Sequence, residues 1–256
     1  LNGNQTALMF VYYLITRWKE LGKINGKEYI VKTIVTTETI KTIAERNGVE
    51  MYDVYTGFKW IANVMRENEG KKNYIGGGEE SYGFLCEDFV RDKDAVSACV
   101  ILAEIAAWAK DQGLSLYQLL QKIYVEYGFS KEKGISVVKK GKSGAEEIEA
   151  MMKKFRENPL TEIAGSKVTY FYDYSTLKGK DYAENETVTL DMPTTSNVLQ
   201  YFTEDNTKVS IRPSGTEPKI KFYCEVHSKV KSLDELPAAE KAGAEKIEAI
   251  KASLGI

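Results

Sequence analysis

The spacing of hydrophobic residues changes along the chain and divides it into two parts. In the first part, short β-branched or aromatic runs alternate with segments whose apolar residues recur every three or four positions. The predicted helices span 5–21, 38–46, 57–67, 94–110 and 115–127, and the predicted strands span 29–35, 50–54 and 73–75. Strands that alternate with helices are typical of βαβ units. This part is therefore predicted to be an α/β domain, with a mixed sheet and flanking helices.

Beyond Gly128, predicted strands outnumber helices. They span 135–138, 168–174, 198–202, 208–211 and 219–226, with helices at 145–156 and 233–254. Asp205-Asn206 suits a hairpin turn between two of these strands. Runs of strands bracketed by helices predict a smaller α+β domain with a mainly antiparallel sheet. We place the domains at residues 1–128 and 129–256.

Composition narrows the class of protein. Hydrophobic residues make up 43% of the 256 residues, which is enough for two cores. The longest apolar run, 95–109, is interrupted by Glu104, and no secretory signal is visible, so we expect no membrane partner and a cytoplasmic location. A net charge of −2 argues against nucleic acid as the main partner. The chain opens at Leu1 inside a helical pattern, which we interpret as a fragment or a processed product.

Cysteine and histidine give little support for a metal site. Cys86, Cys99 and Cys224 are widely spaced, and His227 is the single histidine, so a zinc site is not expected. We predict reduced, half-buried cysteines and a surface position for His227.

The segment Arg212-Pro-Ser-Gly-Thr-Glu-Pro218 carries the clearest chemical signal. It lies between two predicted strands and offers a fixed cation, two hydroxyl groups and backbone N–H groups around Gly215. Arginine supplies a planar fork of donors, and glycine lets the backbone approach an anion closely. This is the composition of a phosphate cradle, but a polar hairpin turn uses the same residue types.

A second polar segment, Gly76–Gly83, follows the third predicted strand. Ligands gather at the carboxyl ends of parallel strands, which makes this position suggestive. Glu79 and Ser81 would point the same way on extended backbone and could bind sugar hydroxyls. The alternatives are a solvated, glycine-rich strand end and a glycosidase pair of Glu79 and Glu80. Adjacent residues on extended backbone face opposite ways, so that pair is a poor acid/base couple.

Two weaker signals lie nearby. Arg91 and Lys93 precede the predicted helix that Asp94 caps, near an anion-attracting helix end. Thr56-Gly57-Phe58-Lys59 places a hydroxyl group and a lysine at another strand end, although Thr56 could simply cap a helix with Lys59 exposed. Taken together, these loops predict a ligand that is anionic and rich in hydroxyls, namely a phosphosugar.

At these motifs the chain resembles the α-D-phosphohexomutases, the phosphoglucomutase/phosphomannomutase family. Residues 78–83 resemble the family's sugar-binding loop, and residues 212–221 its phosphate-binding loop. Residues 1–5, 56–59 and 91–94 resemble further family segments. The resemblance covers essentially the whole chain and implies the third and fourth of four domains. The family's phosphoserine segment, Thr-x-Ser-His-Asn-Pro, and its metal loop, Asp-Gly-Asp-x-Asp-Arg, are not found here.

The resemblance also implies a role for each matching residue. Glu79, Ser81, Thr56, Gly57 and Arg91 would bind the sugar. The phosphate that is not reacting would be held by Arg212, Ser214, Gly215, Thr216 and Lys221, although many members have arginine where Lys221 stands. Lys59 and Lys93 would line the cleft and offset charge near the transferring phosphoryl group.

For the full-length protein, the resemblance implies reversible transfer of phosphate between O1 and O6 of a hexose. It implies a hexose 1,6-bisphosphate as intermediate and activator, and Mg²⁺ held by ligands outside this chain. The partners would be a phosphosugar and the N-terminal domains of the same protein. We expect the chain alone to be inactive, with neither catalytic residues nor metal ligands of its own. A stand-alone phosphosugar-binding module is the alternative, and glucose, mannose, amino-sugar and pentose phosphates all stay open.

Overall fold

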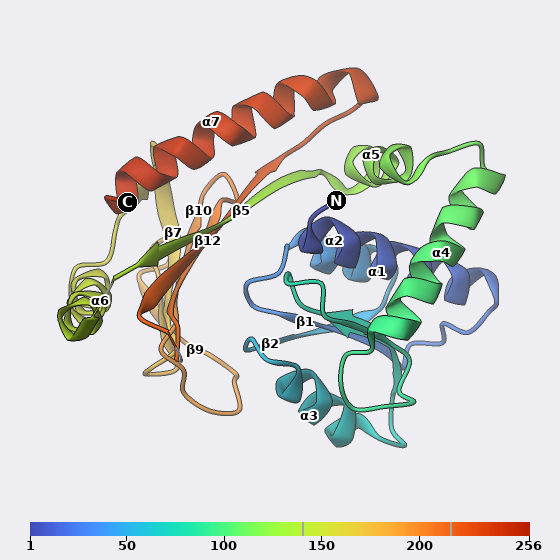
Figure 1. Cartoon of the computed structure of the whole chain (residues 1–256), viewed down its shortest axis with the longest axis horizontal. Helices are drawn as coiled ribbons and strands as arrows, with labels where there is room; N and C mark the ends of the chain where they lie inside the picture. The colour runs from blue at the N-terminus through green and yellow to red at the C-terminus, as the bar shows by residue number, and fades with distance from the viewer. Residues whose placement is uncertain (140, 216) are drawn as a thin grey trace. The chain divides into compact units, whose positions relative to one another are not determined.

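The computed structural model describes residues 1–139, 141–215 and 217–256, which form two compact units (Figure 1). The first unit comprises Leu1–Phe129 and Lys229–Leu236. The second comprises Ser130–Ser228 and Pro237–Ile256. The chain therefore leaves the first unit after Phe129, returns for a short segment, and adds its last helix to the second unit. None of the helices in these ranges is both long and apolar enough to cross a membrane.

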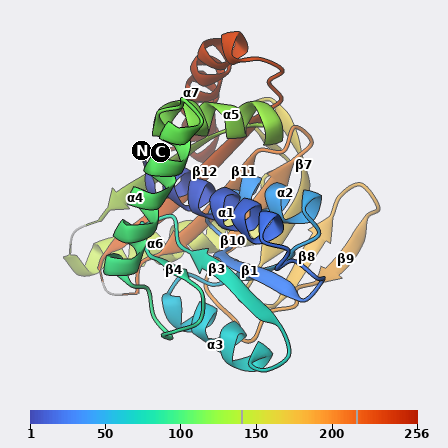
Figure 2. The same cartoon turned by 90° about the vertical axis from the view of Figure 1, so that its right-hand side faces the viewer.

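The first unit is an α/β structure with helices on both faces of its sheet. Its elements are α1 (Gly3–Glu20), β1 (Glu28–Thr33), α2 (Thr39–Arg46), β2 (Glu50–Val54), α3 (Phe58–Asn68), β3 (Asn73–Gly78), β4 (Phe84–Cys86), α4 (Ala95–Asp111) and α5 (Leu116–Tyr127). The strand order is β2-β1-β3-β4; β1 is parallel to β2 and β3, and β4 is antiparallel to β3. Helices α1 and α2 cover one face and α3 the other (Figure 2). The predicted mixed sheet is confirmed.

Strand β1 lies at the centre of this sheet, and all six of its residues are buried. Its neighbours on one face, Ile61 and Met65 of α3, form a core with Tyr29 and Val31. A parallel strand that helices cover on both faces tends to be apolar, and residues 29–31 at the centre of β1 are apolar, although Glu28 and Lys32 are buried as well. The carboxyl ends of β1, β2 and β3 consequently meet at one edge of the sheet, where ligands bind in such folds.

Strand β3 is longer than its sequence pattern predicted. The prediction ended at Ile75, whereas the strand continues through Gly76 and Gly77 to Gly78 and pairs there with β4, which was not predicted. A Cβ atom at Gly77 would overlap the carbonyl oxygen of Val31 and lie 2.7 Å from the Tyr74 hydroxyl. The close approach of backbone atoms requires glycine here, although glycine has low strand propensity.

The second unit is a mainly antiparallel sheet with two helices on one face. Its strands are β5 (Phe129–Val138), β6 (Glu162–Ile163), β7 (Ser166–Asp173), β8 (Lys178–Asp181), β9 (Glu186–Thr189), β10 (Leu199–Thr203), β11 (Lys208–Pro213) and β12 (Lys219–Ser228). The order is β5-β12-β11-β10-β7-β8-β9, with β6 beside β7. The helical segments are α6 (Gly141–Glu157), the 3₁₀ turn η1 (Leu233–Glu235), which belongs to the first unit, and α7 (Leu236–Leu254). The predicted α+β class is confirmed.

The core of the second unit lies between the sheet and both helices (Figure 1). Met152 of α6 and Ile250 of α7 are buried against Ile211 and Phe222 of the central strands. Strands β8 and β9 were not predicted, because each has only four residues and few of them are apolar; β9 lies at the edge of the sheet, where short strands are common. The predicted turn at Asp205-Asn206 is confirmed: Asn206 has a φ of 62° and joins β10 to β11.

A row of charged residues crosses the face of the sheet opposite these helices. The Lys208 ammonium lies 3.0 Å from Oε2 of Glu225, and Oε1 of Glu225 lies 2.8 Å from Nε2 of His227. Lys208 and Glu225 are almost fully buried and His227 is half-buried, so the predicted surface position of His227 is wrong. The predicted half-buried cysteines need the same correction: Cys86 and Cys224 are buried and Cys99 is exposed, all three as free thiols.

His227 should make the stability of the protein depend on pH near neutrality. Desolvation lowers the pKa of His227, but the charge and hydrogen bond of Glu225, with a smaller contribution from Glu132, raise it overall. A histidine whose pKa is raised on folding stabilises fully below its unfolded pKa of about 6.5, and this contribution disappears as pH rises through the folded pKa. We expect the free energy of unfolding, measured with urea, to fall between pH 6 and pH 8. The change should disappear in His227→Gln; an unaltered pH profile in that variant would contradict the prediction.

Candidate functional site

The loop between β3 and β4 folds back on itself instead of extending. The backbone N–H of Glu79 donates to the carbonyl oxygen of Gly83 at 2.8 Å, and Tyr82 has a φ of 71°. The Glu79 side chain is buried, whereas Ser81 and Tyr82 are exposed. The extended backbone on which Glu79 and Ser81 would point the same way is therefore not present in this loop, and their shared role in sugar binding stays a prediction.

Glu79 joins two loops that the sequence predicted separately. Its Oε1 accepts a hydrogen bond of 2.8 Å from the backbone N–H of Gly57, the residue that precedes α3. Gly57 has a φ of 110°, in the region that favours glycine. Gly57 is the N-cap residue, so the alternative in which Thr56 caps the helix is wrong. Lys59 is exposed, as that alternative expected, and its ammonium lies 4.9 Å from the centre of the Trp60 ring.

Lys93 lies beside the same loop. A Cβ atom at Gly83 would be 3.0 Å from both Oε2 of Glu79 and Cδ of Lys93, so these side chains flank Gly83 on the same side. The Lys93 ammonium is 3.2 Å from Oδ1 of Asp92 and stays about half exposed. Asp94 fixes the chain just after Lys93, because its carboxylate accepts a hydrogen bond of 2.7 Å from the Ser97 N–H at the start of α4. Glu79, Gly57 and Lys93 thus form one cluster.

Arg91 is held elsewhere. Its guanidinium lies 3.1 Å from Oε1 of Glu69, the residue that follows the last turn of α3. That helix has 11 residues, and at 1.5 Å per residue its two ends are ~16 Å apart. Gly57 and Glu79 lie at the other end, so Arg91 is not brought to this cluster. Its predicted role in sugar binding stays a prediction.

Three residues near this edge of the sheet were not singled out from the sequence. The Thr33 hydroxyl lies 3.4 Å from Oε2 of Glu80, and the backbone N–H of Thr37 donates to Oδ1 of Asn4 at 3.0 Å. Lys32 is buried and bonded to carboxylates on both sides. These three residues could have been recognised from the sequence as polar residues in and just after the β-branched run of the first predicted strand. The Glu80 carboxylate contacts Thr33 at the end of β1, whereas the Glu79 carboxylate is bonded to Gly57 after β2. The two carboxylates therefore lie at the ends of different strands, which does not favour their acting as the acid/base pair of a glycosidase.

In the second unit, the predicted phosphate loop connects β11 to β12. The loop closes through a hydrogen bond of 2.8 Å from the Ser214 N–H to the Lys219 carbonyl oxygen. Glu217 forms an ion pair with Lys219, and this hydrogen-bonded ammonium, with the more distant Lys221, lowers the pKa of Glu217. Thr216 lies outside the described residues. A Cβ atom at Gly215 would meet nothing within 4 Å, so packing within the protein does not require glycine there.

Arg212 and Lys221 are directly opposite each other on the antiparallel strands β11 and β12. Residues in such a pair project from the same face of the sheet, with their Cβ atoms about 5 Å apart. Neither side chain forms a hydrogen bond or ion pair with any residue in the described ranges. Like charges in this position destabilise a sheet. The loop is therefore flanked by two adjacent cations without a carboxylate partner in this part of the chain.

A metal centre is not apparent in the ranges that the structure describes, where no three His, Cys, Asp or Glu residues come together as ligands. The residues present therefore do not fit a magnesium site. The prediction that such a site lies outside this chain stays a prediction.

The two units correspond to consecutive domains of one class of enzyme, the phosphohexomutases. Residues 2–127 match the family model described as phosphoglucomutase/phosphomannomutase, alpha/beta/alpha domain III, and residues 136–243 match the C-terminal domain of the same family. The chain belongs to the phosphoglucomutase/phosphomannomutase family.

Similar proteins are considerably longer than this chain. The phosphoglucomutase of Staphylococcus aureus (strain MRSA252) is 38% identical over 222 residues, which are 87% of this chain and 39% of that protein. The phosphoglucomutase of Staphylococcus haemolyticus (strain JCSC1435) is 34% identical over 221 residues, again 39% of its length. The chain thus spans about two fifths of the length of these relatives.

Solved structures agree on the fold. The open form of pp63/parafusin, a phosphoglucomutase from Paramecium, superposes with a TM-score of 0.57 at 17% identity. The superposition covers 97% of this chain and 42% of the Paramecium chain. A phosphoglucomutase/phosphomannomutase family protein from Burkholderia thailandensis gives a TM-score of 0.56 at 17% identity, with 98% and 42% of the two chains covered. At this identity the likeness concerns the fold alone.

Proposed function

We propose that this chain is the substrate-holding part of a phosphohexomutase. The first unit binds sugar hydroxyls through Glu79 and Ser81, with the loop at Thr56 and Gly57 beside them. The second unit holds the phosphate that is not reacting through Arg212, Ser214, Gly215, Thr216 and Lys221. In the whole protein, phosphate then passes between O1 and O6 of a hexose through a bisphosphorylated intermediate.

The observation that carries this proposal is the opposed pair of cations at Arg212 and Lys221. Two unpaired like charges on one face lower the stability of a sheet, and a phosphate placed between them would reverse that cost. Gly215 adds support: neither packing nor a left-handed backbone requires glycine there. A ligand that approaches the backbone closely is a sufficient reason for it.

In the first unit, the contact between Glu79 and Gly57 supports the sugar-binding role. One carboxylate oxygen is occupied by the Gly57 N–H, which holds Glu79 in place. The other oxygen faces Gly83 and Lys93 and can accept from a hydroxyl group. Lys93 flanks Gly83 together with Glu79, whereas the Lys59 ammonium lies over the Trp60 ring, so we assign to Lys93 first, and to Lys59 second, the task of offsetting charge on the phosphoryl group.

The chemical step needs residues beyond those found here. We propose that the phosphoserine, the Mg²⁺ ligands and the general acid and base lie in the further domains that the longer relatives contain, with a hexose 1,6-bisphosphate as activator. On its own, this chain would bind a hexose phosphate without turning it over. A match to relatives more than twice its length supports this view over a self-sufficient binding module.

The proposal is tested by measuring binding of glucose 1-phosphate and glucose to this chain by calorimetry. A charge-assisted hydrogen bond contributes about 1.5–3 kcal/mol, so Arg212→Gln and Lys221→Gln should each weaken glucose 1-phosphate binding roughly 10- to 100-fold. Glucose binding should hardly change. Lys221→Gln should also raise the free energy of unfolding by a few tenths of a kcal/mol, because it removes the like-charge repulsion.

Lys178→Gln is the matched control, since it removes one exposed charge from strand β8 of the same unit. It should leave both affinities unchanged. If all three variants weakened binding equally, general electrostatic attraction would explain the result and the two residues would lose their assigned role. Equal losses for glucose and glucose 1-phosphate would equally remove them from a phosphate site.

A further inference from the structure

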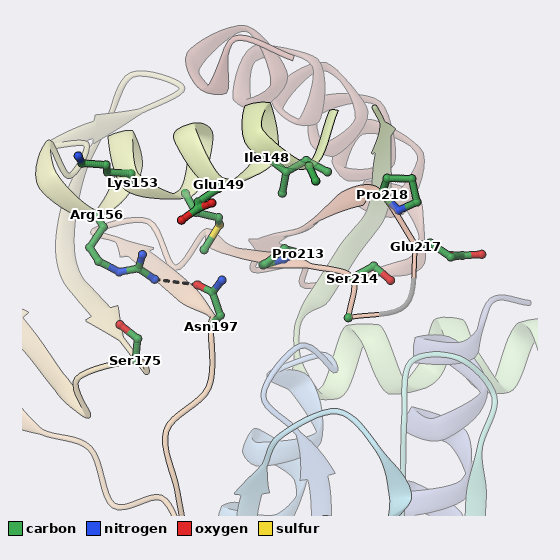
Figure 3. Close-up of a pocket in the computed structure, with 13 residues that line it drawn as sticks. Ile148, Glu149, Lys153, Arg156, Ser175, Asn197, Pro213, Ser214, Glu217 and Pro218 are labelled. Atoms are coloured by element: carbon green, nitrogen blue, oxygen red, sulfur yellow. Dashed lines mark hydrogen bonds between the residues drawn. The ribbon is translucent and has the colours of Figure 1, made fainter. Parts of the chain in front are cut away.

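A cavity of about 730 Å³ lies in the second unit, between helix α6 and the ends of strands β7, β10 and β11 (Figure 3). Cavities that hold small ligands commonly measure about 300–1,000 Å³. One end of the cavity is formed by Ser214 and Gly215 of the proposed phosphate loop. The rest is formed by residues that have no part in the proposed function, above all those of α6.

The end of the cavity away from that loop carries Arg156 and Lys153, each of which is paired with a carboxylate (Figure 3). Nε of Arg156 donates to Oδ2 of Asp173 at 3.0 Å, and Nη2 donates to Oδ1 of Asn197 at 2.8 Å. Asp173 is itself held by the Ser175 hydroxyl at 2.7 Å. These bonds use two of the five N–H groups of the guanidinium and fix its plane. Lys153 stands one turn earlier on α6 and is exposed, with its ammonium 3.9 Å from Oε1 of Glu157.

The middle of the cavity is apolar. Ile148 and Met152 project from α6, where they also belong to the core of the unit, and Pro213 faces them from β11. Apolar surface of this kind gains about 25 cal/mol for each Å² that a ligand removes from water. The middle of the cavity therefore suits a hydrocarbon chain or an aromatic ring.

Glu149 limits the charge that a ligand can carry. It lies on the α6 side of the cavity, and its carboxylate forms no hydrogen bond or ion pair with the described residues. A second negative charge on the ligand would be repelled there, whereas a single carboxylate at the Arg156 end could accept from the guanidinium N–H groups that Asp173 and Asn197 leave free. This distribution selects a monoanion and disfavours a phosphate dianion.

We propose that this cavity binds a small amphipathic acid. Its single carboxylate is held by Arg156 and Lys153, and its apolar body lies on Ile148, Met152 and Pro213. Because Ser214 and Gly215 form the other end, the occupant also contacts the phosphate loop. If the acid changes the affinity for phosphate, phosphate changes the affinity for the acid by the same factor. This linkage rests on the proposed function, whereas binding of the acid by itself does not.

Three probes with the same aromatic body test the charge selection: 4-phenylbutyrate, 4-phenylbutan-1-ol and 4-phenylbutylamine. Calorimetric titration of the whole chain should give the tightest binding for the acid, by about tenfold over the alcohol, and the weakest for the amine. Equal affinity for all three, or tightest binding of the amine, would overturn the proposal.

Variants locate the probe. Ala145→Trp fills the cavity from an exposed position on α6 and should abolish binding of 4-phenylbutyrate. Ala150→Trp places the same side chain on the same helix outside the cavity and should leave binding unchanged. Arg156→Gln should weaken binding about tenfold, whereas Glu149→Gln should strengthen it about twofold. Because Arg156 also links three elements, the other variants decide the question if Arg156→Gln does not fold. Undiminished binding to Ala145→Trp would place the probe elsewhere and refute the site.

Inorganic phosphate tests the linkage. The affinity for 4-phenylbutyrate should change at least twofold when phosphate is saturating, and Arg212→Gln should abolish this change. If phosphate binds but the affinity for the acid does not move, the linkage is wrong. If phosphate does not bind at all, the proposed function fails, and the titrations without phosphate still decide whether the cavity takes the acid.

Discussion

Gly3→Ala should destabilise the first unit by about 3 kcal/mol and displace the predicted sugar-binding loop. Gly3 is the first residue of α1 and packs against the main chain of that loop. A Cβ atom at this position would overlap the carbonyl oxygen of Glu80, 2.6 Å from its carbonyl carbon and 2.9 Å from the Tyr82 nitrogen. Overpacking a tight site costs about 1–3 kcal/mol, and main-chain atoms cannot rotate away as side chains do, so we expect the upper end of that range.

Urea unfolding measures this loss, and amide hydrogen exchange of residues 79–83 measures the movement of the loop. Gly134→Ala is the matched control, because a Cβ atom at Gly134 would meet nothing within 4 Å. Its effect should lie between no change and a gain of about 1 kcal/mol, since alanine reduces the entropy of the unfolded chain. If Gly3→Ala kept normal stability and normal exchange in the loop, the packing of α1 on the loop would not be tight.

Lys208→Met should cost about 3–5 kcal/mol, because it leaves a buried carboxylate with less compensating charge. Lys208 and Glu225 have side chains only 2% and 4% exposed, so neither can regain hydration when its partner is lost. Removing both charges together is often close to neutral, so the double variant Lys208→Met/Glu225→Leu should recover most of the loss. The measurement is the free energy of unfolding of the wild type, both single variants and the double variant.

The exposed pair Lys41–Glu45 on α2 is the control for this experiment. Its charges are 3.9 Å apart and at least half exposed, so Lys41→Met should change stability by no more than about 0.5 kcal/mol. Similar losses at Lys41 and Lys208 would mean that burial does not determine the cost. In Lys208→Met, Glu225 still has His227 as a partner, so the fall in stability between pH 6 and pH 8 should become steeper.

The sequence was sufficient to predict most elements and the class of both units. The apolar stripe of α1, the buried residues of β1 and the capping residue Asp94 depend on a few neighbouring positions. The secondary structure at each of them can therefore be predicted from the local sequence. Gly76–Gly78 were misread as a strand end. Their place in the sheet depends on how closely Val31 and Tyr74 approach them, which local propensity does not encode.

The candidate site shows the same division. Residue types in the 79–83 and 212–218 segments pointed to a phosphosugar, and the chain does belong to the family that those segments resemble. The sequence could not foresee that Glu79 is buried and bonded to Gly57 while Ser81 is exposed, or that Arg91 is held by Glu69. The two contacts join residues that are far apart in the sequence.

What the sequence determined by itself, then, was the periodicity of the elements, the chemistry of the loops and the kind of ligand that this chemistry suits. The tertiary structure decided which of those residues meet: the cluster of Glu79, Gly57 and Lys93, the opposed cations Arg212 and Lys221, and the cavity beside α6. The physical reason is the distance along the sequence over which each interaction acts. Propensity, capping and periodicity act between near neighbours in sequence, whereas burial, charge pairing and cavity shape depend on residues that only the folded chain brings together.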